Sequence, residues 1–239
     1  MHFFLSYNFL SVVFLCASFS ISAQQLDAFF KSTNTFLSTY VKNGRVDYKA
    51  ISKNPTVLNS LLDQAAQVNV LISEPENYKA FWINAYNLAV IKGLVNNYPT
   101  KSPLDDKGFF DKTTYKLAGQ ELSLNGIEND LLRAKFNDAR FHFVLVCGAL
   151  GCPPLISEAY IPGTLEAQLT QQTQKAINGN FIKVSKNKVE VSEIMKWYKA
   201  DFTQNGQTEI DFINAYRNTR ISKQLKLSYF PYNWNINAL

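Results

Sequence analysis

The sequence predicts an α+β protein, with a mainly helical single domain and a small mixed or antiparallel sheet. Three observations lead to this class. Apolar residues recur at helical spacing over several long segments, short strand patterns lie between them, and the two interleave without a regular βαβ repeat. No internal repeat, low-complexity tract or long Pro/Gly/Ser linker divides the chain, so we expect one domain over residues 24–239.

Three helices are expected in the N-terminal part. The segment Leu26 to Val41 has apolar residues at helical spacing, and Asn43-Gly44 ends the pattern. A second helix covers Val57 to Val70. The third and longest runs from about Glu76 to Asn97, and Pro99 ends it because the residue before a proline disfavours the helical conformation. Apolar or aromatic residues occur on every side of this third helix, so it is expected to be buried all round.

The remaining elements alternate between strands and helices. The patterns predict, in order, a strand pair around Thr114 to Leu117 and Glu121 to Leu122, a helix from Gly126 to Lys135, a strand from Phe141 to Cys147, a helix from Leu165 to Ile177, a hairpin from Phe181 to Val191 turning at Lys186-Asn187, and short helices near Ile194 to Asp201 and Glu209 to Tyr216. An aromatic tail, "YFPYNWN", follows them.

Residues 1–23 are predicted to be a secretory signal peptide. They contain no Lys, Arg, Asp or Glu, and their apolar middle runs into the small residues Ser22 and Ala23. Leu15 is too bulky for a lipoprotein site at Cys16, and no basic stop-transfer cluster follows; an uncleaved anchor is the alternative. We expect cleavage near Ala23 and a secreted or periplasmic chain with no transmembrane helix in its mature part.

Charge and composition argue against several classes of function. The chain has 24 Lys and Arg against 19 Asp and Glu, which is only a mild basic excess. Its densest basic stretch, Arg217 to Lys226, is typical of a solvated helix face, with an anionic surface as the alternative. It carries no nucleic-acid motif, so no nucleic-acid partner is expected. After residue 23 the chain keeps one histidine and two cysteines, which is too few for a metal site, and no cofactor is expected.

Two polar residues interrupt the long apolar helix. Asn84 and Asn87 are three apart and share a face. A buried amide without a partner costs about 1–3 kcal/mol, so each should bond to a neighbouring loop or strand. In one interpretation the two amides brace a turn. In the other, one of them orients a catalytic imidazole or donates to a reacting oxygen.

The segment "LSLNGIENDLLR" has the spacing of a capping box. Asn125 precedes an amphipathic run and Glu128 lies three residues later, so the Glu128 side chain is expected to point at the backbone of Asn125. The alternative is that Glu128 also contacts a functional site. Arg133, in the last turns, could pair with Glu128 or with another acid.

The segment "FHFVLVCGALGCPPL" contains the strongest candidates for chemistry. Strand alternation would place His142 and Cys147 on opposite faces, whereas Gly148 and Gly151 permit a bend that returns Cys152 toward the imidazole. In an exported protein two nearby cysteines favour a disulfide. The alternatives are a catalytic or redox thiol with His142 as its base, or two inert thiols. We predict that Asn84, Asn87, His142 and a cysteine share one pocket.

Five ordered segments resemble the domain of unknown function 547 family. They are "FWINAYNLAVI", "LSLNGIENDLLR", "RFHFVLVCGALGCPPL", "MKWYKADF" and "YFPYNWNIN", which together extend from residue 78 to residue 237. The resemblance implies no established activity. It does imply that the following residues occupy the family's marked positions: Trp82, Asn84, Asn87, Glu128, Arg133, His142, Cys147, Cys152, Pro153, Trp197, Asp201, Tyr232 and Trp234. Gly151 departs from the serine expected before the second cysteine.

Three functions are compatible with these residues. The first is a non-catalytic binding or scaffold module for a protein or peptide-like ligand, with a polar His/Asn/Cys pocket and binding residues Trp82, Asn87, Arg133, Trp197 and Trp234. The second is a cysteine-dependent hydrolase or acyl transferase, papain-like or transglutaminase-like in layout, with catalytic candidates Cys147, Cys152, His142, Asn84 and Glu128. The third is thiol redox exchange, which rests on the cysteine pair alone.

Overall fold

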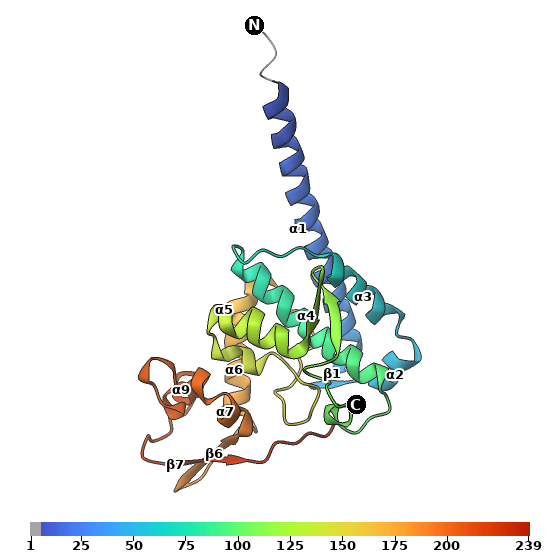
Figure 1. The fold of residues 1–239 in the computed structure, drawn as a ribbon. Helices are drawn as coiled ribbons and strands as arrows, with labels where there is room; N and C mark the ends of the chain where they lie inside the picture. Colours follow the sequence, from blue (N-terminus) through green and yellow to red (C-terminus); the bar gives the residue numbers. More distant parts are fainter. Residues whose placement is uncertain (1–5) are drawn as a thin grey trace.

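The computed structural model describes residues 6–239, and the side chains from residue 23 onward. Its first helix, α1 (Ser6–Tyr40), projects at its N-terminal end away from the body of the protein (Figure 1). The predicted leader falls on this projecting end; residues 1–5 lie outside the described residues, as do the side chains of residues 6–22. Within the described part, no helix is both long and apolar enough to cross a bilayer.

The other regular elements are short, apart from three helices of twelve or more residues. The helices after α1 are α2 (Tyr48–Lys53), α3 (Thr56–Gln67), α4 (Pro75–Asn96), α5 (Ala134–Phe136), α6 (Leu165–Asn178), α7 (Glu193–Trp197), α8 (Lys199–Phe202) and α9 (Glu209–Tyr216). A π-helix, η2 (Gly126–Arg133), precedes α5, and the 3-10 turns are η1 (Pro103–Asp105), η3 (Ala139–Phe143), η4 (Pro162–Thr164) and η5 (Gln204–Gly206). The strands are β1 (Val41–Lys42), β2 (Arg45–Val46), β3 (Thr114–Leu117), β4 (Gln120–Ser123), β5 (Ile182–Val184), β6 (Lys188–Ser192) and β7 (Lys226–Phe230).

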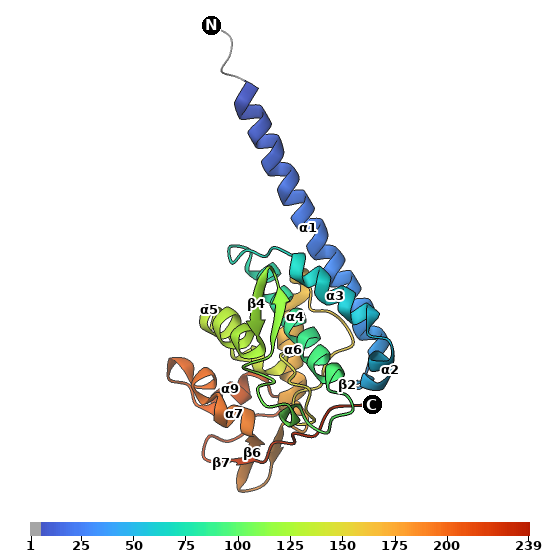
Figure 2. The same cartoon turned by 45° about the vertical axis from the view of Figure 1, so that its right-hand side comes forward.

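Helix α4 is the centre of the larger hydrophobic core. Almost every side chain from Tyr78 to Val95 is buried, which confirms that this helix is enclosed on all sides. Helix α1 packs against α2 and α3, and all three helices pack against α4 (Figure 2). This part of the predicted fold class, a mainly helical domain, is confirmed.

A smaller core lies on the other side of α6. Its buried members include Phe143, Ile177, Val191 and Phe212, from η3, α6, β6 and α9. The sheet beside it is mixed: β5 and β6 are antiparallel, whereas β6 and β7 are parallel, with Val191 opposite Tyr229. The two other sheets are antiparallel pairs, β1 with β2 and β3 with β4. The prediction of small mixed and antiparallel sheets is therefore confirmed.

The expected strand from Phe141 to Cys147 is wrong. The chain forms the 3-10 turn η3 instead, with the Asp138 carboxylate accepting the N–H of Arg140, and continues without regular structure. The backbone groups of a strand need a neighbouring strand, and here α4 occupies that place. The Asn87 amide accepts the N–H of Val146 at 2.9 Å and donates to the Val144 carbonyl at 2.9 Å. One side chain thus replaces a strand partner.

Asn84 performs the same task for a second loop. Its Nδ2 donates to the carbonyls of Ala80 and Tyr160, and its Oδ1 accepts the N–H of Tyr160. Both asparagines of α4 are therefore occupied by backbone groups. This agrees with the interpretation in which the two amides brace turns.

The C-terminal tail returns across the molecule to the first core. After β7 it runs past the segment Leu150–Gly151, whose N–H groups donate to the carbonyls of Asn235 and Asn233, and ends beside β2 (Figure 1). The buried Asn237 anchors it, because its side chain accepts the hydroxyl of Tyr48 at 2.7 Å. This path places the aromatic residues of the tail next to the cysteine segment.

Candidate functional site

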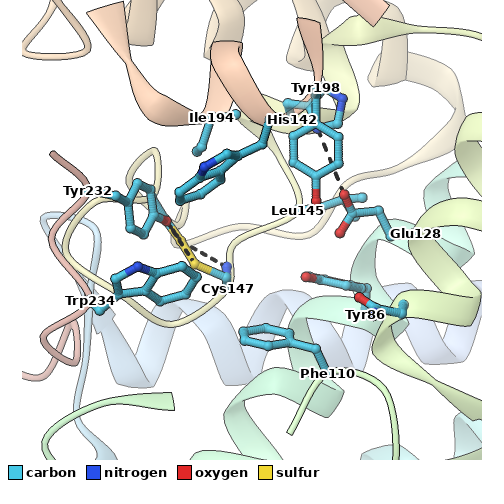
Figure 3. A pocket seen from close by; sticks show the side chains of 13 residues that line it. Tyr86, Phe110, Glu128, His142, Leu145, Cys147, Ile194, Tyr198, Tyr232 and Trp234 are labelled. Carbon is cyan, nitrogen blue, oxygen red and sulfur yellow. Dashed lines mark hydrogen bonds and ion pairs between the residues drawn. A yellow bond between two sulfur atoms is a disulfide. The ribbon is translucent and has the colours of Figure 1, made fainter. Parts of the chain in front are cut away.

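A cavity of about 280 Å³ lies where the two cores meet. Its walls come from α4, the loop before β3, η2, η3 and the segment after it, α7 and the C-terminal tail (Figure 3). Six of its lining residues are phenylalanine, tyrosine or tryptophan. The thirteen lining residues are Tyr86, Phe110, Asn125, Glu128, His142, Leu145, Cys147, Cys152, Ile194, Trp197, Tyr198, Tyr232 and Trp234.

Glu128 lines this cavity and does not cap its helix, so the capping-box prediction is wrong. Asn125 already has helical dihedral angles and makes no side-chain cap. The helix begins earlier, and the hydroxyl of Ser123 accepts the N–H of Gly126 at 3.1 Å. The Asn-x-x-Glu spacing therefore falls inside the helical turn, where Glu128 is free to point at the cavity and is only 7% exposed.

Two tyrosine hydroxyls hydrogen-bond to the Glu128 carboxylate. They belong to Tyr86, on α4, and Tyr198, after α7. Burial is the main cause that raises the pKa of both tyrosines, and the nearby Glu128 charge raises it further. Both hydroxyls are therefore protonated near neutral pH and can donate to the carboxylate.

His142 is held between two carboxylates. Its Nε2 is 2.7 Å from Oδ2 of Asp201, and its Nδ1 is 3.9 Å from Oε1 of Glu128. Its ring stacks on Tyr198, with centroids 4.0 Å apart, and only 2% of its side chain is exposed. The Asp201 contact places the proton of a neutral imidazole on Nε2, so Nδ1 is left to face Glu128.

Asp201 is fixed from its other side by Arg133. The guanidinium donates from Nε to Oδ2 at 2.7 Å and from Nη2 to Oδ1 at 3.0 Å, which is a bidentate pair. Burial alone would raise the pKa of Asp201, but the hydrogen bonds from His142 and Arg133 outweigh it and hold this pKa well below its usual range. Arg133 also bonds to Asn129 and lies over the Tyr198 ring at 4.6 Å. The acid that pairs with Arg133 is thus Asp201, and not Glu128.

Cys147 and Cys152 form a disulfide in the wall of the cavity, with their Cα atoms 6.3 Å apart. The Tyr232 hydroxyl lies 2.9 Å from each sulfur. The chain turns at Gly148, which has a φ of +81°. This confirms the bend predicted there, because glycine adopts positive φ values without strain. Gly151 has a different role, because a Cβ there would lie 2.8 Å from the Tyr232 ring.

We expect both of these cysteines to be oxidised in the exported protein. Alkylation of natively purified protein that lacks residues 1–23, without prior reduction, should leave its intact mass unchanged. Alkylation after reduction should add two labels. Labelling of two thiols without a reductant would contradict the disulfide and favour the hydrolase interpretation, and in that case a slower reaction in His142→Ala would identify the base.

The wall beside the disulfide is aromatic. Trp197 stacks with Trp234, with ring centroids 5.8 Å apart and ring planes at 23°. The ring centroid of Tyr232 lies 5.1 Å from that of Trp197 and 4.7 Å from that of Trp234. Trp197 is 46% exposed, whereas Trp234 and Tyr232 are partly buried. The Phe110 ring packs edge-on against Trp234, with ring centroids 6.3 Å apart. A large indole left half-exposed at a cavity mouth is a common feature of binding surfaces.

The structure brings together only some of the predicted site residues. His142, Glu128, both cysteines, Trp197 and Trp234 line the cavity, and Arg133 supports it through Asp201. The predicted shared pocket is wrong for the asparagines, because Asn84 and Asn87 are occupied by loop backbone and neither lines the cavity. Trp82 is buried in the main core against Tyr78 and Phe81.

Sequence reasoning did not assign several residues of this site. Tyr86 and Tyr198 bond to Glu128, and Asp201 orients His142, although it lies 59 positions further along the chain. Asp201 and Tyr232 occur in segments with a family resemblance, which was the only signal for them. Nothing in local spacing links an acid after α7 to a histidine in η3.

Comparison with known proteins identifies one match. Residues 72–177 match the family model described as "Protein of unknown function, DUF547". This confirms the resemblance over α4 to α6, which includes Glu128, Arg133, His142 and both cysteines. Asp201 and the aromatic residues of α7 and the tail lie beyond the matched residues. No curated protein and no solved structure matches the chain.

Proposed function

We propose a role from the site, because residues 72–177 match a family that is described only by its unknown function, DUF547. The protein is an exported binding module that takes one compact group of a ligand into the aromatic cavity. Glu128, His142 and Asn125 provide the polar part of the site, and the rings of Trp197, Tyr232 and Trp234 provide the apolar part. Secretion by way of the residue 1–23 leader is part of this proposal.

The single observation that carries the proposal is the preorganised wall of the cavity. The disulfide closes the segment between Cys147 and Cys152, and the tail is bonded to that segment by backbone hydrogen bonds. The polar residues are fixed as well, since His142, Asp201 and Arg133 form a continuous chain of bonds. A site whose side chains are already held loses little conformational entropy when a ligand binds.

The alternative, cysteine-dependent hydrolysis, is supported less well. It requires a thiolate near a base, and in the disulfide neither sulfur can act as a standing nucleophile. In addition, both ring nitrogens of His142 face carboxylates rather than a thiol. The volume also fits a compact group, since sites for drug-sized ligands are about 300–1,000 Å³.

We expect a screen of compact organic compounds to identify ligands that change tryptophan fluorescence and raise the melting temperature. Two of the three tryptophans line the cavity, so ligand binding should alter their emission. Trp197→Leu should weaken binding about tenfold, because a ring at the mouth is lost. Its exposure makes misfolding of this variant a small risk.

The matched control is Leu104→Ala, which removes an equally exposed apolar side chain outside the cavity lining. Binding that is weakened equally by both substitutions would contradict the proposal. So would a screen in which no compound binds. Ester hydrolysis by the purified protein that stops after reduction and alkylation would favour the thiol enzyme instead.

A further inference from the structure

We propose that the group bound in the cavity is an organic cation, namely a quaternary or methylated ammonium head. This inference rests on the proposed binding function and specifies its ligand. It follows from the charges on the cavity wall, from the partners that those charges already have, and from the position of the aromatic rings opposite them.

The charge of the lining favours a cation. Among the thirteen lining residues there is one carboxylate, that of Glu128, and there is no lysine or arginine. An anionic ligand would therefore meet a carboxylate, with no lysine or arginine in the wall to bind it. A cationic ligand would meet a complementary charge.

The Glu128 carboxylate has no bidentate cationic partner of its own. Arg133 is the nearest guanidinium, and it is committed to Asp201 through two hydrogen bonds and to Asn129 through a third. The His142 Nε2 is likewise used by Asp201, and the distance from its Nδ1 to Glu128 is 3.9 Å, which is beyond hydrogen-bond range. The Arg133 charge attracts Glu128, but every hydrogen bond of its guanidinium goes to Asp201 or Asn129, so the Glu128 carboxylate can still accept a cation from the cavity.

Burial makes this charge significant. The Glu128 side chain is 10% exposed, and its hydrogen-bonding neighbours are the neutral hydroxyls of Tyr86 and Tyr198. A carboxylate that is largely removed from water is costly unless it is paired and hydrogen-bonded. The hydroxyls of Tyr86 and Tyr198 meet the hydrogen-bonding need, and a bound cation would supply the opposite charge.

The opposite wall consists of aromatic rings. Figure 3 shows Tyr232 and Trp234 across the cavity from Glu128, with Phe110 below them. Trp197 adds a fourth ring to this group through its contacts with Tyr232 and Trp234. Ring faces carry partial negative charge, so several rings together bind quaternary ammonium groups well, and tryptophan binds them best.

A methylated ammonium fits this combination better than a primary ammonium does. Its methyl groups present an apolar surface to the rings, and its charge is spread and weakly hydrated, so little hydration is lost on entry. It does not require the hydrogen bonds that a primary ammonium would seek, and the Glu128 oxygens already accept bonds from Tyr86 and Tyr198. Charge attraction and ring contact then act together.

The test compares two ligands of the same shape. Choline carries the cation, and 3,3-dimethylbutan-1-ol is its neutral isostere, in which carbon replaces nitrogen. We expect choline to bind the full mature protein about tenfold more tightly than the alcohol in calorimetry, which is the scale of a desolvated cation–π contact. Equal affinities, or tighter binding of the alcohol, would overturn the inference.

Two variants test which residues cause the preference for choline over the alcohol. Glu128→Gln keeps the shape but removes the charge, and it should weaken choline binding about tenfold while the alcohol binds as before. Trp234→Leu should also weaken choline more than the alcohol. Binding of the alcohol that is retained shows that each variant is folded and keeps its cavity. The matched control is Glu121→Gln on β4, an exposed carboxylate outside the cavity lining, which should change neither affinity.

The outcomes separate this inference from the proposed function. If the alcohol or other neutral compounds bind and choline does not, the proposed binding function is supported and the inference of a cationic ligand is wrong. If no compound of any charge binds, both are wrong. A choline preference that persists in Glu128→Gln and in Trp234→Leu would place the cation elsewhere and would overturn the assignment to this cavity.

Discussion

Asn87→Ala should lower the free energy of unfolding by about 3 kcal/mol, because it leaves two buried backbone groups without partners. The Val144 carbonyl and the Val146 N–H both bond to this side chain, and both residues lie in the core. The segment they hold leads from His142 to Cys147, so the cavity wall should loosen as well. Urea unfolding followed by circular dichroism measures the loss.

Asn77→Ala is the matched control, since Asn77 lies on the same helix and bonds only to the exposed side chain of Glu74. It should change the unfolding free energy by less than about 0.5 kcal/mol. Similar values for the two substitutions would show that the Asn87 bonds contribute no more to stability than a surface asparagine. The interpretation of Asn87 as a replacement for a strand partner would then be wrong.

Asp201→Asn should cost about 2 to 3 kcal/mol of stability near neutral pH, because Arg133 and His142 lose a shared carboxylate in a largely buried place. The side chains of Asp201 and Arg133 are 17% and 25% exposed, which places the effect below that of a fully buried pair. Asparagine keeps the size of the side chain and one acceptor. The choline affinity should fall too, since His142 is no longer fixed beside Glu128.

The pH dependence tests the same pair. The pKa of Asp201 is lower in the folded protein than in the unfolded chain, where it is about 3.9, so its contribution to stability is fully present above about pH 5. As the pH falls below about 5, the carboxylate begins to protonate in the unfolded chain and the contribution declines. The stability difference between the native protein and Asp201→Asn should therefore shrink as the pH is lowered.

Asp130→Asn supplies the comparison for this experiment, because Asp130 is an exposed aspartate on the same π-helix as Arg133. Its stability should follow that of the native protein at every pH. A gap between Asp201→Asn and the native protein that stays constant from pH 7 to pH 3 would show that the charge of Asp201 is not what stabilises the pair.

The aromatic cavity also explains why the cysteine pair is a structural part of the site. The Tyr232 hydroxyl bridges both sulfurs, and the same ring packs at a tilt against Trp197 and Trp234 in the wall. The disulfide thus fixes the ring that faces Glu128. Oxidation of the cysteines and the binding role proposed for the cavity are consistent with one another.

Local patterns in the sequence determined most of the regular elements. Helix α4 could be predicted because its apolar residues occur on every side, and its end because Pro99 follows it. The hairpin of β5 and β6 and the strand pair of β3 and β4 could be predicted for a similar reason, since each is built from neighbours in sequence. The bend at Gly148 likewise follows from a property of the residue itself.

Only the tertiary structure decided the residues around the cavity. The strand expected from Phe141 to Cys147 has the right composition, but no strand lies beside it, and Asn87 binds its backbone instead. Glu128 has the spacing of a cap, but the helix begins before Asn125, so its side chain turns to the cavity. Asp201 reaches His142 from 59 positions away. Sequence patterns report the conformation of neighbours, whereas these contacts join segments that are distant in the chain and meet only when the two cores pack.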